Sequence, residues 1–126
     1  MTVKFATRVF NAAGIYGILA LFPQYFLASK IGHDNPPAIT HPEYFYGFIG
    51  VALAWQVVFL IIARDPVRYR AVMIAAVLEK LAFGIPAIVL FARGSIPATV
   101  LGFGCVDLVL GTLFAISFRA TAAELK

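Results

Sequence analysis

The stretch AAVLEKLAFGIPA, residues Ala75 to Ala87, places an acid and a base side by side in an otherwise apolar segment. An ionisable side chain at the centre of a membrane helix costs about 2.5–3.5 kcal/mol on insertion scales. Such residues are retained where they find a partner or a water-filled cavity. We therefore expect the rest of the chain to supply partners for Glu79 and Lys80 inside a membrane-spanning fold.

The composition is that of an integral membrane protein. The chain has 126 residues, of which 62% are hydrophobic and 13% charged, whereas a soluble domain carries about 25% charged residues. The length fits one transmembrane domain over residues 1–126. The net charge of +4 does not indicate nucleic acid, because the basic residues flank the apolar segments, where they set topology. We expect the lone Cys105 to be a buried, inert residue.

Four apolar segments are long enough to cross a bilayer core, which takes about 20 residues in a helix. Because a backbone in lipid must satisfy its own hydrogen bonds, each is expected to be helical. The predicted transmembrane helices cover about 9–28, 44–63, 66–92 and 97–118. The first is too long for the apolar part of a signal peptide. The sequence thus predicts an all-α, polytopic four-helix bundle.

Polar residues followed closely by proline mark the expected helix starts. They are Thr40 or His41 before Pro42, Asp65 before Pro66, and Ser95 before Pro97. The longest connection, Ser29–His41, contains Pro36-Pro37 and is expected to be stiff and non-helical. The other connections are short, so consecutive helices are expected to pack as antiparallel neighbours.

The distribution of lysine and arginine predicts the orientation in the membrane. One side carries Lys4, Arg8, Arg64, Arg68, Arg70, Arg119 and Lys126, whereas the other carries only Lys30 and Arg93. Basic residues accumulate on the cytoplasmic side, so both termini are expected on the cytoplasmic side of a bacterial inner membrane. An aromatic belt is expected on the outer side, formed by Tyr25, Phe26, Tyr44 and Tyr46.

Each predicted helix contributes a strong polar group at a comparable depth. The candidates for a proton or ligand site are Asn11, Gln56, Glu79, Lys80 and Asp107. A structural interpretation pairs Lys80 with Asp107, and such interhelical bonds average about 0.6 kcal/mol. A functional interpretation notes that two acids face one lysine, which leaves one acid to be protonated or neutralised by something else.

Small residues surround the charged positions. Gly104 and Gly111 share a helix face with Asp107, and Gly84 lies one turn from Lys80. Such residues let membrane helices approach closely. Pro86 also frees the carbonyl of Ala82, about one turn from Glu79.

No motif names a reaction, so no catalytic residue and no cofactor is assigned. The chain has no phosphate-binding glycine loop, nucleophile elbow or CxxC pair. His33, Asp34, His41 and Glu43 are metal ligands by type, but their spacing matches no compact motif, so no metal is predicted.

The topology, the arginine that opens the first helix and two stretches together resemble the DoxX-like group of small bacterial membrane proteins. The stretches are HPEYFYGFIGVALAWQ (His41–Gln56) and ARDPVRYR (Ala63–Arg70). The resemblance implies a four-helix membrane fold without an established activity. Where such proteins are discussed functionally, they are membrane partners of redox enzymes, and no redox motif occurs here.

Three functions remain open at this point. The first is a binding or accessory protein that joins a membrane complex or forms a homo-oligomer. The second is a small proton-coupled or cation transporter that uses Glu79 and Asp107. The third is a lipid-modifying enzyme in which the same two carboxyl groups act as acid and base.

Overall fold

The computed structural model describes residues 2–125, in which all of the regular secondary structure is helical. The helices are α1 (Val3–Leu21), η1 (Phe22–Phe26), α2 (Ala28–Asp34), α3 (Pro42–Arg64), α4 (Val72–Ala92), α5 (Ala98–Ala120) and η2 (Ala122–Leu125). Four stretches are long and apolar enough to span a membrane: Val3–Phe26, Pro42–Arg64, Val72–Ala92 and Ala98–Leu125. The predicted all-α class with four membrane-length helices is confirmed.

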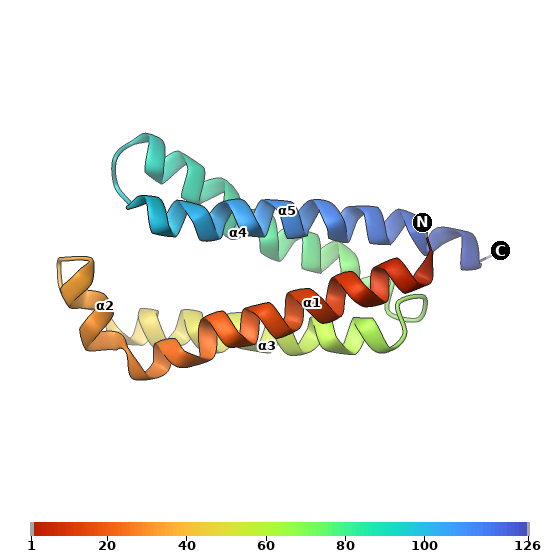
Figure 1. Cartoon of the computed structure of the whole chain (residues 1–126), viewed down its shortest axis with the longest axis horizontal. Helices are drawn as coiled ribbons and strands as arrows, with labels where there is room; N and C mark the ends of the chain where they lie inside the picture. The colour runs from red at the N-terminus through yellow and green to blue at the C-terminus, as the bar shows by residue number, and fades with distance from the viewer. Residues whose placement is uncertain (1, 126) are drawn as a thin grey trace.

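The four long helices form two hairpins, α1 with α3 and α4 with α5 (Figure 1). Contacts between α1 and α5 join the hairpins, whereas α3 and α4 touch only sparsely. The expectation that consecutive helices pack as neighbours is therefore wrong for α3 and α4. Bulky side chains, Phe48 and Trp55 on α3 and Phe83 on α4, face each other there, and small residues are what allow close approach.

Close approach is instead found between α4 and α5. A Cβ atom on Gly104 would lie 2.5 Å from the Cβ of Ala87, and one on Gly84 would lie 3.0 Å from the carbonyl oxygen of Gly104. Neither position has room for a larger side chain without the helices moving apart. The predicted small-residue face around Asp107 is confirmed as a packing face.

Three buried aromatic rings join the two hairpins. Phe10 of α1 stacks on Phe114 of α5 with ring centroids 4.2 Å apart, and Phe59 of α3 meets Phe114 edge-on at 4.9 Å. All three side chains are fully buried. Offset-stacked and edge-to-face pairs are favoured ring geometries, so this cluster fixes how one hairpin sits on the other.

Some helix ends differ from the predicted bounds. α1 begins at Val3 rather than near residue 9, and after Leu21 it tightens into the 3-10 helix η1, which contains Pro23. α3 begins at Pro42, two residues before the predicted bound of about 44, and its N-cap is His41, one of the two predicted residues, although that side chain makes no capping hydrogen bond. α5 begins after Pro97, which is itself the N-cap, so Ser95 does not cap it.

α4 begins at Val72, later than the predicted start at residue 66. The Asp65 carboxylate does accept a hydrogen bond from the backbone N–H of Arg68 at 3.1 Å, as a capping residue would. The chain then makes successive turns up to α4, and within them Arg70 contacts α5. Its guanidinium donates to the carbonyl oxygen of Phe118 at 2.8 Å and lies 3.6 Å from the centroid of that ring.

The connection Ser29–His41 is not entirely non-helical, because α2 occupies its first half. Lys30 and Asp34 are four residues apart and form a hydrogen-bonded ion pair of 2.7 Å, the spacing that stabilises short helices. This hydrogen bond lowers the pKa of Asp34 and raises that of Lys30. The non-helical part begins at Asn35, just before the two prolines.

The two ends of the molecule differ in character. Tyr25 stacks on Tyr46 with ring centroids 6.0 Å apart, at the end that carries α2. The two termini lie together at the opposite end (Figure 1), near the α3–α4 connection with Arg64, Arg68 and Arg70. Lys126, which also counts toward this basic set, lies outside the described residues.

Candidate functional site

Lys80 of α4 lies between two carboxylates. Lys80 is only 4% exposed, and its Nζ donates to Oδ1 of Asp107 on α5 at 3.2 Å. The same Nζ lies 3.5 Å from Oε2 of Glu79 and 5.2 Å from the ring centroid of Phe59. We call Glu79, Lys80 and Asp107 the charged triad.

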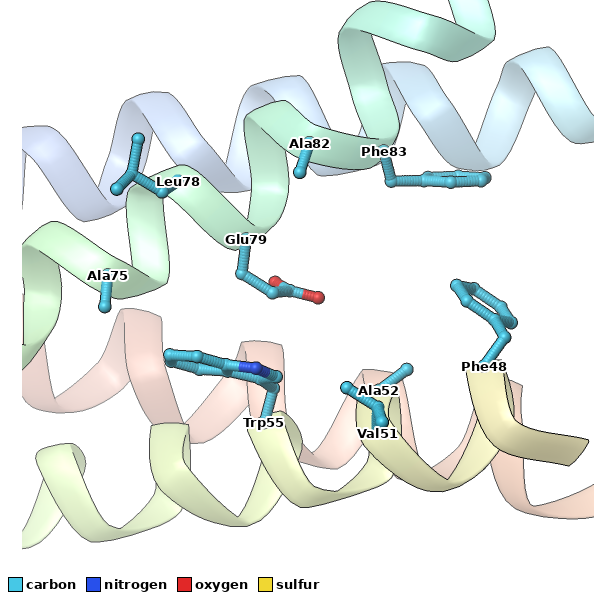
Figure 2. Close-up of a pocket in the computed structure, with 9 residues that line it drawn as sticks. All are labelled: Phe48, Val51, Ala52, Trp55, Ala75, Leu78, Glu79, Ala82 and Phe83. Carbon is cyan, nitrogen blue, oxygen red and sulfur yellow. The ribbon is translucent and has the colours of Figure 1, made fainter. Parts of the chain in front are cut away.

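The helix geometry separates the two neighbours on α4. Consecutive helical residues project about 100° apart, so Lys80 faces α5 while Glu79 faces the gap between α4 and α3 (Figure 2). Gly111 of α5 makes room for the lysine, because a Cβ there would lie 3.2 Å from the Cβ of Lys80. The long lysine chain carries its ammonium back within reach of both carboxylates.

The charges of the triad do not cancel when both acids are ionised, since one ammonium faces two carboxylates. The side chains of Asp107 and Glu79 are 15% and 18% exposed, so both are largely withdrawn from the surface. Asp107 receives the lysine hydrogen bond, whereas Oε2 of Glu79 is enclosed and has no hydrogen-bond partner among residues 2–125. Glu79 is thus the less satisfied acid.

An open groove of about 640 Å³ separates α3 from α4. Its lining is Phe48, Val51, Ala52 and Trp55 from α3 with Ala75, Leu78, Glu79, Ala82 and Phe83 from α4. Glu79 is the one charged residue of this lining, and its carboxylate points into the space between the helices (Figure 2). Asp107 is not part of the lining.

The two amide candidates do not join the triad. Gln56 of α3 is 1% exposed and donates from Nε2 to the carbonyl oxygen of Ala52 at 2.8 Å. It packs against Gly17 of α1, where any Cβ would collide with it. Its Oε1 is buried without a hydrogen-bond partner in the described residues. Asn11 of α1 is exposed on the outer surface of the bundle.

Sequence reasoning missed the aromatic residues around the triad. Trp55 and Phe48 are seven residues apart on α3, and Phe83 follows Glu79 by four on α4, so each pair shares a helix face. This spacing is the signal from which the groove face could have been predicted.

The remaining reactive side chains lie apart from the groove. His33 contacts Asp34 at 3.4 Å, and His41 contacts Glu43 at 3.3 Å, as two pairs of neighbours along the chain. No cluster of three His, Cys, Asp or Glu side chains suited to a metal occurs between residues 2 and 125. Cys105 is exposed on α5, so its expected burial is wrong.

The site therefore combines an apolar groove, one incompletely satisfied carboxylate and a buried ion pair behind it. Comparisons with protein-family models, with curated proteins and with solved structures found no match. The arrangement can bind a hydrophobic group and place a negative charge beside it.

Proposed function

We propose that the protein is a small membrane-embedded binding protein, which acts as an accessory component of a membrane complex and holds a hydrophobic occupant between α3 and α4. The observation that carries this proposal is the Glu79 carboxylate inside an otherwise apolar groove of about 640 Å³. Ligand pockets are typically apolar and contain a few polar groups that fix orientation. An ionisable residue within a membrane span is a functional candidate by default.

The same geometry gives less support to a lipid-modifying enzyme. Two carboxyl groups that divide acid and base roles must both reach the reacting atoms. Glu79 lines the groove, whereas Asp107 is hydrogen-bonded to Lys80 and lies outside the lining. The groove thus offers a substrate one carboxyl group rather than two.

Transport is the second candidate, and the charge count of the triad favours it. With two acids and one lysine, Glu79 can release a proton when a cationic cargo arrives and take it back when the cargo leaves. Four helices enclose little space, so a transporter of this size would work as an oligomer. Proton-coupled uptake of a cation into liposomes, lost in Glu79→Gln, would place this candidate first.

We place the protein in a bacterial cytoplasmic membrane, with both termini in the cytoplasm. The basic residues of the α3–α4 connection lie at the end of the molecule that holds both termini, and such residues favour the cytoplasmic side. The resemblance to DoxX-like proteins supports the same location. It also makes a membrane-bound enzyme complex a reasonable partner.

The test is whether occupancy of the membrane protein depends on the groove. The full-length chain is extracted with its native lipids and its bound species are compared by native mass spectrometry. Ala82→Phe fills the groove, whereas Ala54→Phe adds the same ring at an exposed alanine of α3 outside the lining. We expect a bound species in the wild type and in Ala54→Phe that is lost in Ala82→Phe. Identical bound species in all three proteins would refute the proposal.

A further inference from the structure

We propose that the occupant of the groove between α3 and α4 is a hydrophobic organic cation, such as a lipophilic amine or quaternary ammonium compound, with its positive charge beside Glu79. This inference rests on the proposed binding function and names the chemical class of the ligand. It goes beyond that function because the groove alone would equally admit a neutral lipid.

The charge of the triad is the first argument. Lys80 gives its hydrogen bond to Asp107, and its contact with Glu79 is longer and is not a hydrogen bond. When both acids are ionised, one negative charge is left over, and it lies on the groove side. A carboxylate in apolar surroundings is costly unless a counter-charge reaches it. A cation in the groove supplies a counter-charge for the second acid, whereas a neutral acyl chain would leave the triad with one uncompensated negative charge.

The walls of the groove are the second argument. Trp55, Phe48 and Phe83 line it together with Glu79 (Figure 2). Aromatic faces attract cations, and tryptophan attracts them most strongly. Aromatic rings together with one carboxylate suit an organic cation, because such a cation is weakly hydrated and can leave water for an apolar site. The volume of about 640 Å³ lies within the range of about 300–1,000 Å³ typical of small-molecule sites.

Pro86 adds an acceptor at the same level of α4. It lies inside the helix and has no N–H, so the carbonyl of Ala82 lacks its usual helical donor. Ala82 itself lines the groove. A protonated amine would therefore find a carboxylate and, about one turn along this helix, a carbonyl that lacks its usual donor.

A second copy of the chain fits the groove less well than a small cation. The counter-charge must arrive at the depth of Glu79, within the apolar part of the span. Lys80 is the one basic residue in the middle of a membrane-length helix between residues 2 and 125, and it is buried against α5. A neighbouring copy therefore has no free cation to offer at this depth.

Tetraphenylphosphonium is the cationic probe. Its binding can be followed by tryptophan fluorescence, because Trp55 is the only tryptophan of the chain and lines the groove. The full-length protein in phosphatidylcholine nanodiscs is titrated with this cation, with tetraphenylborate, an anion of matched size, and with neutral triphenylmethane, while tryptophan fluorescence is followed. Ala82→Phe retains Trp55 and reports quenching by probe dissolved in the lipid. Ala54→Phe is the matched control for an added ring outside the groove.

We expect saturable quenching by tetraphenylphosphonium alone, retained in Ala54→Phe and lost in Ala82→Phe. Glu79→Gln should weaken binding at least about tenfold, because the ion pair is replaced by a neutral contact, and Glu79→Asp should weaken it less. The comparison of cation with anion in the wild type does not use the Glu79→Gln variant. It therefore still tests the inference when that variant fails to fold.

Two outcomes overturn the inference in different ways. If triphenylmethane binds as well as the cation, and Ala82→Phe blocks both, the groove binds neutral molecules and only the ligand class is wrong. If no probe shows a signal that Ala82→Phe removes, and native mass spectrometry finds no groove-dependent species, the proposed function fails as well.

Discussion

Lys80 has two possible carboxylate partners, and their distances predict which one matters for stability. Its ammonium donates to Asp107 at 3.2 Å and lies 3.5 Å from Glu79 without a hydrogen bond. Removing one partner of a buried charge is costly because it leaves the other charge unpaired. Glu79 remains nearby when Asp107 is lost, which limits that cost.

We predict that Asp107→Asn lowers the free energy of unfolding by about 1–3 kcal/mol, whereas Glu79→Gln lowers it by less than about 1 kcal/mol. The difference follows from Lys80 keeping its hydrogen bond in the second variant. Reversible unfolding in mixed detergent micelles measures both values. Equal losses in the two variants would show that Lys80 relies on both acids alike.

The membership of the triad could be predicted from residue type, but the positions of the amides could not. Charged residues are rare enough in membrane spans that Glu79, Lys80 and Asp107 stand out in the sequence. The sequence predicts a comparable depth for Gln56 and Asn11, yet a helix must also be rotated correctly for a side chain to face the site. That rotation depends on packing contacts, such as Gly17 against Gln56, that no single residue reveals.

At the scale of the elements, α4 and α5 provide a test with its control on the same helix. A Cβ on Gly104 would lie 2.5 Å from the Cβ of Ala87, whereas one on Gly102 would meet nothing within 4 Å. We predict that Gly104→Ala destabilises the protein by about 1–3 kcal/mol, as overpacking does. Gly102→Ala should be neutral or stabilising by about 0.5–1 kcal/mol, because alanine is the better helix former.

Unfolding in mixed micelles again provides the measurement. The test is which of the two glycine variants has the lower free energy of unfolding. A common effect on both would mean that the helices approach each other less closely than the Gly104–Ala87 contact implies. The circular dichroism of the folded proteins should be unchanged, since both residues lie within α5.

The short helix α2 should respond to acid. The hydrogen bond from Lys30 and the contact with His33 lower the pKa of Asp34 below its ordinary value of 3.8. A lowered pKa means that the ion pair stabilises α2 above that ordinary value and that this contribution disappears as the pH falls through the lowered one. We predict constant helix content in α2 from about pH 5 to 9 and a loss below about pH 4.

The carbon chemical shifts of Ile31 and Gly32 in nanodiscs report this change. Asp34→Asn removes the carboxylate, so it should reduce helix content at neutral pH and abolish the acid response. If α2 keeps its shifts at pH 2, the Lys30–Asp34 pair does not hold it.

The four long helices were predictable because length and hydropathy alone determine what can cross a bilayer. Two local features were not. α2 depends on an exposed ion pair next to two prolines, and prolines are the stronger signal in the sequence. The turns before α4 include Arg70, whose partner Phe118 lies far along the chain and is not visible in the local sequence.

At the scale of the whole molecule, the groove exists because the hairpins are joined mainly through α1 and α5. α1 contacts α5, and the ring cluster of Phe10, Phe59 and Phe114 holds that side together, while α3 and α4 diverge. Sequence reasoning that packs each helix on the next closes this space, and so it did not predict the groove.

The orientation of the whole molecule yields the last prediction. In a Cys105→Ser background, single cysteines replace Thr40, at the end that carries α2, or Ala123, next to the C-terminal end. We predict that a membrane-impermeant maleimide labels Thr40→Cys in intact bacterial cells and labels Ala123→Cys only after permeabilisation. The reason is that the basic residues of the α3–α4 connection lie at the end with the termini and are retained in the cytoplasm.

Changing that charge provides the control, because orientation should follow the basic residues rather than the apolar helices. Replacing Arg64 and Arg68, both exposed, by glutamine should allow a fraction of the chains to insert with Ala123→Cys accessible from outside. Arg70 is left in place, since it holds the connection to α5. Labelling of Ala123→Cys in intact cells carrying the unaltered arginines would reverse the assignment, and the termini would then lie on the outer side of the membrane.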